Sequence, residues 1–196
     1  MKTYDYRVRH RVLLGDLHTP VSTYLKVRDL FPQSFLMESS DYHGSENNRS
    51  FIGLNPLARL SVNHGVATAV FPDDSREEIP VAGKEDVERV MTGFLSRFRA
   101  TGEYAGYCGL YGYTAFNAVR YFEPVNVPDS REDKNDAPDI LYILYKYLIV
   151  FNDFKSELVL IELQAEEESS HLDEVARAVH DRNYTTYGFR PVGETS

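Results

Sequence analysis

Two apolar runs that flank a short polar turn constrain the fold of this 196-residue chain more than any other feature. Residues 147–151 read Tyr-Leu-Ile-Val-Phe, and residues 156–163 form a second run that ends in Val-Leu-Ile-Glu-Leu. The four residues between them, Asn-Asp-Phe-Lys, are typical of a turn. The pattern therefore predicts two strands, the second of which returns antiparallel to the first.

The remaining segments place helices among further strands. A helix is expected from Pro20 to about Asp29, because Thr19 is a good N-cap and proline suits the first helical position. A longer amphipathic helix is expected at 84–99. Further strands are expected at 4–14, 34–38, 50–55, 58–63, 65–71 and 104–113, turns or short helices at 72–80, 115–122 and 138–145, and a last helix from 169 or 170 to about 182. Without regular β-α-β alternation, this order predicts an α+β fold with a mixed, largely antiparallel sheet and helices packed on it.

Composition excludes several classes of function. The net charge is −9 and lysine and arginine do not cluster, so a nucleic-acid partner is not expected. No apolar run approaches the ~20 residues that span a bilayer, and residues 1–5 do not begin a signal peptide, so neither a membrane nor export is expected. The single cysteine, Cys108, favours the cytoplasm and is expected to be a small core residue. The six histidines show no metal-ligand spacing.

One polar segment carries groups that suit a zwitterionic ligand. Glu38, Ser39 and Ser40 follow an apolar run, and Arg49 precedes the next run. A carboxylate accepts hydrogen bonds from an ammonium group, whereas a guanidinium and hydroxyls bind a carboxylate. The plain alternative is a strand end, a solvated polar loop and a new strand.

Three blocks of sequence resemble anthranilate synthase component I in its N-terminal region. The first is the segment 35–53, with its Leu-Met-Glu-Ser-Ser motif; the second runs from the glycine-rich 109–113 to Ala-Val-Arg-Tyr-Phe-Glu at 118–123; the third is Pro-Asp-Ile at 138–140 with Val-Phe-Asn at 150–152. They occur in family order. In the second block, Phe116-Asn117 stands where Tyr-Asp is common. Component I of p-aminobenzoate synthase shares much of the pattern.

The resemblance implies a role in L-tryptophan biosynthesis. The family, a lyase, converts chorismate to anthranilate with ammonia from a glutamine amidotransferase subunit, component II, and uses Mg²⁺. Its chorismate-binding domain is C-terminal, so residues 1–187 are expected to form the regulatory domain and 188–196 the start of a linker. We therefore expect no catalytic residue, metal site or cofactor in this chain, and no activity from the chain alone.

For this region the resemblance implies part of the tryptophan feedback site. The matching positions are Glu38, Ser39, Ser40 and Arg49, with pocket walls from Met37 and Phe51. Some family members carry lysine at the position of Arg49. The alternatives are the equivalent domain of p-aminobenzoate synthase component I, in the folate pathway, and a stand-alone domain that binds a small molecule or another protein.

Overall fold

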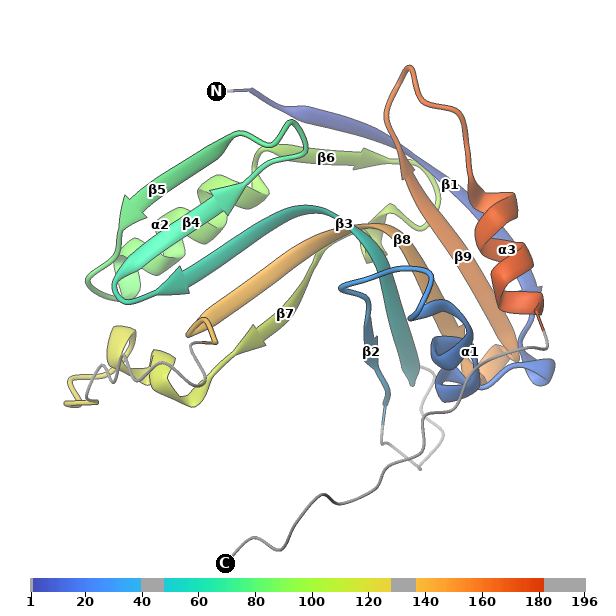
Figure 1. Cartoon of the computed structure of the whole chain (residues 1–196), viewed down its shortest axis with the longest axis horizontal. Coiled ribbons are helices and arrows are strands. Elements are labelled where there is room, and N and C mark those ends of the chain that lie inside the picture. The colour runs from blue at the N-terminus through green and yellow to red at the C-terminus, as the bar shows by residue number, and fades with distance from the viewer. Residues whose placement is uncertain (1, 40–47, 128–136, 182–196) are drawn as a thin grey trace, which may run out of the picture.

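A computed structural model describes residues 2–39, 48–127 and 137–181 of the chain (Figure 1). Within these ranges nine strands form one sheet, and three α-helices accompany it. The strands are β1 (Tyr4–Leu14), β2 (Phe35–Met37), β3 (Arg49–Asn63), β4 (Val66–Val70), β5 (Arg76–Pro80), β6 (Phe98–Thr101), β7 (Leu110–Thr114), β8 (Ile140–Asn152) and β9 (Glu157–Gln164). The α-helices are α1 (Pro20–Val27), α2 (Lys84–Leu95) and α3 (Leu172–His180), and the 3₁₀ helices are Gly15–Leu17, Ala105–Tyr107, Phe116–Tyr121 and Asp153–Lys155.

The strand order is β5-β4-β3-β8-β9-β1-β6, with β2 paired to β3 and β7 paired to β8. All of these pairs are antiparallel except β1 with β6. The predicted α+β class and largely antiparallel sheet are therefore confirmed. The predicted domain boundary after residue 187 lies outside the described residues.

Strands β3 and β8 are the longest, and both curve strongly (Figure 1). Their register shifts between Pro56 and Ala58, and Asn55 has a positive φ of 58°. The two strands that we expected on either side of Pro56 are thus one bulged strand, because a bulge lets the ladder continue past a residue without an N–H group. Beyond the bulge the neighbour of β3 changes: β2 lies beside its first half and β4 beside its second half.

Two apolar clusters hold the helices on the sheet. On one half, α2 contributes Val87, Val90 and Phe94 to the larger cluster. On the other half, α1 and α3 cover a second cluster, to which they contribute Val27 and Val179. Helix α1 begins as expected: the Thr19 hydroxyl accepts a hydrogen bond from the Ser22 N–H group at 3.1 Å, and the Ser22 hydroxyl accepts one from Thr19.

Several element predictions were wrong in their type or length. Residues 138–145, expected to form a helical turn, are mostly the first half of β8, whose side chains are buried on both faces and so show no two-residue alternation. Residues 76–80 are strand β5 within a segment expected to be a turn. The helix expected at 84–99 ends at Leu95, because its last aromatic residue, Phe98, belongs to strand β6 and pairs with Tyr4. In the glycine-rich segment, a 3₁₀ turn precedes the short strand β7.

Candidate functional site

Most of the predicted site residues lie at the end of β2 and the start of β3, which are paired. Met37, the last residue of β2, pairs with Phe51 of β3. Glu38 and Ser39 therefore follow β2 at the point where Arg49 begins β3. The antiparallel pairing joins the two sides of the polar segment, as a binding site would require. Ser40 lies outside the described residues.

The backbone of Ser39 is already engaged in this arrangement. Its N–H group donates to the Ser50 hydroxyl at 3.2 Å, and Ser50 is buried, with 1% of its surface exposed. This hydrogen bond fixes the chain just after β2 to the start of β3. Glu38, by contrast, is exposed.

Arg49 lies over an aromatic ring. Its guanidinium carbon is 5.7 Å from the centre of the Tyr107 ring, within the range of a cation–π contact. Its Nε atom is buried and has no hydrogen-bond partner among the described residues, although the residue as a whole is half-buried. Arg49 therefore carries an unsatisfied donor at the place where the sequence predicts a cation for a ligand.

Five rings form an aromatic cluster beside Arg49: Phe35, Phe51, Tyr107, Tyr111 and Tyr145. Their ring centres lie 4.9–5.9 Å apart in four contacting pairs. Gly53 makes room for the cluster, since a Cβ atom there would lie 2.0 Å from the Phe35 ring. Sequence reasoning identified only Phe51 of these five. For Tyr107 and Tyr111 the available sequence signal was the alternation of glycine and tyrosine at 106–113, which indicates close packing but no binding site.

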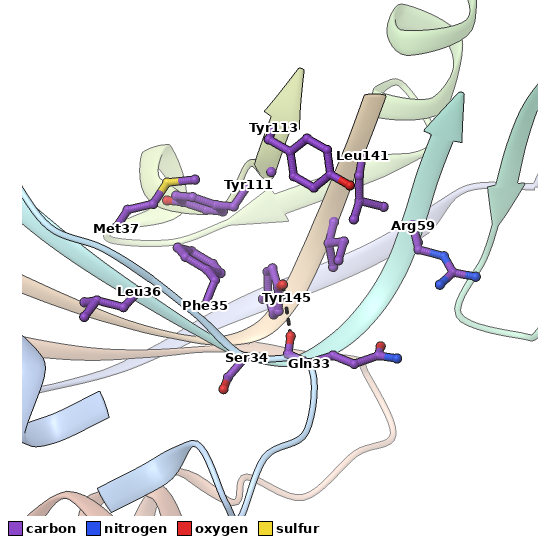
Figure 2. Close-up of a pocket in the computed structure, with 12 residues that line it drawn as sticks. Gln33, Ser34, Phe35, Leu36, Met37, Arg59, Tyr111, Tyr113, Leu141 and Tyr145 are labelled. Carbon is purple, nitrogen blue, oxygen red and sulfur yellow. Dashed lines mark hydrogen bonds between the residues drawn. The ribbon is translucent and has the colours of Figure 1, made fainter. Parts of the chain in front are cut away.

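A cavity of about 500 Å³ opens on one side of the aromatic cluster (Figure 2). Strands β2, β3, β7 and β8 and the residues before β2 all contribute to its wall: Gln33, Ser34, Phe35, Leu36, Met37, Arg59, Tyr111, Gly112, Tyr113, Leu141, Ile143 and Tyr145. This volume is in the usual range for small-molecule sites, and most of the lining is apolar, as in such sites. Met37 is the predicted wall residue that reaches the cavity.

Two hydroxyl groups of the cluster, those of Tyr111 and Tyr145, stay protonated. Burial raises the pKa of Tyr145 to about 12, and burial also raises the pKa of Tyr111 strongly. As neutral donors they bond to backbone carbonyls, Tyr145 to Gln33 at 3.1 Å and Tyr111 to Tyr107 at 2.7 Å. They therefore fix the walls of the cavity and the turn that carries Tyr107.

Cys108 follows this turn and packs against the larger apolar cluster. Burial raises the pKa of its thiol to about 11, so the group is protonated at neutral pH. A nucleophilic cysteine requires a shift in the other direction. The surroundings of Cys108 thus agree with the expected core role.

A second polar network lies at the far end of β7. Arg120 is 3.4 Å from the buried Asp139 carboxylate, and the Tyr121 hydroxyl donates to the same carboxylate at 3.0 Å. That hydroxyl also accepts the Gly65 N–H group at 3.1 Å, which ties the 3₁₀ helix to the β3–β4 turn. Phe116, at the position where the family commonly has tyrosine, is 85% exposed.

Two structural tests bear on metals and membranes. Among the described residues, no group of three or more His, Cys, Asp or Glu side chains is arranged to hold a metal ion. Within the same residues no helix has the length and apolar character needed to cross a membrane.

Comparisons with known proteins agree with the sequence resemblance. No protein-family model matches the chain. Anthranilate synthase component 1 of Thermus thermophilus is 31% identical over 155 residues, which cover 79% of this chain and 32% of that protein. The protein of the same name from Acinetobacter calcoaceticus is 32% identical over 175 residues, which cover 82% of this chain and 33% of that protein. The chain thus spans about one third of the length of these relatives. Anthranilate synthase component I of Streptococcus pneumoniae, a solved structure, gives a TM-score of 0.46 at 18% identity over 86% of this chain and 34% of its own.

Proposed function

This chain is related to anthranilate synthase component 1 over about four fifths of its length, and we propose that it forms the regulatory N-terminal part of such an enzyme. Its role there is to bind L-tryptophan and to inhibit the enzyme when tryptophan is abundant. The observation that most supports this proposal is that Glu38 follows β2 where Arg49 begins the paired strand β3, with Arg49 lying over the Tyr107 ring of the aromatic cluster. A carboxylate, a cation and rings are the three partners that an aromatic amino acid needs.

Each part of tryptophan has a partner of matching chemistry in this proposal. The ammonium group donates to the Glu38 carboxylate, and the tryptophan carboxylate accepts from the Arg49 guanidinium. The Ser39 N–H group already donates to Ser50, so the second donor is a hydroxyl group rather than this backbone group. Met37 and Phe51 offer apolar surface to the indole ring.

Catalysis belongs to the whole enzyme in this proposal. Such an enzyme makes anthranilate from chorismate, with ammonia from a glutamine amidotransferase subunit and with Mg²⁺, in the cytoplasm. The described residues offer no donor set for Mg²⁺, so no step is assigned to that metal in this chain. We propose that the 196-residue chain does not form anthranilate by itself; turnover of chorismate by the purified chain with ammonia and Mg²⁺ would contradict this.

Tryptophan binding is the direct test. The chain contains no tryptophan, so a bound tryptophan is the only indole fluorophore present. We expect the indole emission to shift on titration with the chain, and Arg49→Ala to weaken that response. The matched control is Arg76→Ala, which alters an exposed arginine on β5. A wild-type chain that never changes the indole emission, or an Arg49 variant that binds like the wild type, would refute the assignment.

A further inference from the structure

We infer that Tyr107 is a positioning residue, which holds the Arg49 guanidinium so that its N–H edge faces a carboxylate ligand. The inference rests on the proposed function for the identity of the ligand, but the geometry is independent of it. The guanidinium lies 5.7 Å from the Tyr107 ring centre, and its buried Nε atom has no hydrogen-bond partner among the described residues. A carboxylate oxygen of a ligand would accept the hydrogen bond that this Nε–H group lacks.

The Tyr107 ring is itself held in place from several sides. Tyr107 ends a 3₁₀ turn, and its carbonyl group accepts the Tyr111 hydroxyl at 2.7 Å. The Tyr104 ring stacks on it, with the ring centres 6.2 Å apart and the ring planes 21° from parallel. The Phe51 ring contacts it at 5.9 Å. A ring fixed in this way gives a fixed platform for the side chain above it.

A platform of this kind matters because a free arginine side chain has many rotamers. Ordering a long side chain costs conformational entropy each time a ligand binds. A guanidinium that already lies on a ring has lost part of that freedom, and its planar shape leaves the N–H edge available for a carboxylate. Lysine, which some family members carry here, lacks the planar group. The Tyr107 ring can therefore fix the plane of the arginine guanidinium, whereas the ammonium group of a lysine has no plane to fix.

The first measurement follows the Arg49 Nε–H proton by NMR in the 196-residue chain. Because this atom is buried beside the ring, we expect a sheltered resonance shifted by the ring current of Tyr107. Tyr107→Phe should keep the resonance in place, since the ring remains, and Tyr107→Leu should move it. The control is Tyr4→Leu, which removes a ring from under another cation, Lys2, and should not move the Arg49 resonance. Backbone spectra show whether each variant is folded.

The second measurement adds ligands to the same samples: L-tryptophan, acetate and tryptamine, which lacks the carboxylate. We expect the Arg49 resonance to respond to tryptophan and to acetate but not to tryptamine. Tyr107→Leu should weaken the response to tryptophan by about 2- to 5-fold, as expected for the loss of one cation–π contact, and Tyr107→Phe should restore it.

The outcomes separate this inference from the proposed function. If Tyr107→Leu binds tryptophan as the wild type does, the positioning role is wrong and the tryptophan site stands. If the resonance depends on Tyr107 and responds to acetate but not to tryptophan, the carboxylate site stands and the proposed function fails. If no carboxylate moves the wild-type resonance, both are refuted.

Discussion

The molecule has two polar regions that differ in how their charged groups are satisfied. One is the start of α3, and the other is the end of β2 together with the start of β3. At the start of α3, the fully buried Glu162 accepts hydrogen bonds from the Ser170 hydroxyl at 2.5 Å and the His171 N–H group at 3.1 Å. At the ends of β2 and β3, Glu38 is exposed and the buried Nε atom of Arg49 has no partner among the described residues. The first set of polar groups is satisfied within the fold, whereas the second set leaves a carboxylate exposed and a buried donor without a partner among the described residues.

The largest effect should come from the region whose polar groups are already satisfied. Glu162→Leu removes the fully buried acceptor of two hydrogen bonds at the start of α3, and each hydrogen bond to a carboxylate contributes ~1.5–3 kcal/mol. We expect the free energy of unfolding to fall by about 2–5 kcal/mol, measured by urea denaturation. The control is Glu166→Gln, an exposed carboxylate just after β9, which should change stability by less than about 0.5 kcal/mol. If the two variants were equally stable, the polar groups at the start of α3 would not stabilise the fold, and this region would not differ from the end of β2 and the start of β3.

Arg49→Ala should show the opposite pattern, with a small effect on stability and a large effect on the ligand. A hydrogen bond to a charged group contributes ~1.5–3 kcal/mol, so loss of the guanidinium should weaken tryptophan inhibition of the proposed whole enzyme by about 10- to 150-fold. Inhibition curves at fixed chorismate measure this. An Arg49 variant that is inhibited at the wild-type tryptophan concentration would show that the polar ends of β2 and β3 do not bind tryptophan.

Gly53→Ala tests whether the aromatic cluster depends on close packing. The new methyl group would lie 2.0 Å from the Phe35 ring and 2.9 Å from Tyr145, so at least one ring must move. We expect a loss of about 1–3 kcal/mol in the free energy of unfolding, as for other overpacked sites. Gly93→Ala is the control, since a Cβ atom there meets no atom within 4 Å. A thermal shift no larger than that of the control would mean that the cluster adapts freely.

The smallest effect concerns the thiol beside the aromatic cluster. Burial raises the pKa of Cys108 from 9.0 in its ordinary state to about 11 in the fold. The fold therefore favours the protonated thiol, and the stability gained from this is complete below pH 9 and is lost as the pH rises towards 11. At pH 8 a thiol reagent should modify the folded chain much more slowly than the urea-unfolded chain. Equal rates would show that the thiolate forms readily in the fold.

The sequence predicted features that depend on neighbouring residues better than features that depend on distant ones. The start of α1 was predicted because Thr19 and Pro20, two neighbouring residues, supply its N-cap and its first helical position. The end of α2 was not, because Phe98 continues the apolar spacing of the helix and only its pairing with Tyr4 makes it part of a strand.

The same distinction applies to the candidate site. The resemblance identified Arg49 and Phe51, and the structure pairs Phe51 with Met37 and starts the same strand at Arg49, but their binding of tryptophan stays a prediction. The ring under Arg49 was not predicted, because Tyr107 reaches it only through the packing of β7 and the preceding turn against β3 and β8. No local pattern around Arg49 carries that information.

The position of β1 in the sheet also has a consequence for how the chain folds. This strand is made first, yet its two neighbours are β6 and β9, so that Tyr4 pairs with Phe98 and Arg7 pairs with Gln164. Closing such long loops costs entropy before any pairing is gained, and chains rich in distant contacts fold in roughly milliseconds to seconds rather than microseconds. During synthesis the first strand must wait with unpaired edges until most of the sheet has left the ribosome. Arg7, Arg9 and Arg11 alternate along it, and charged side chains of this kind disfavour pairing of an open strand edge with other chains.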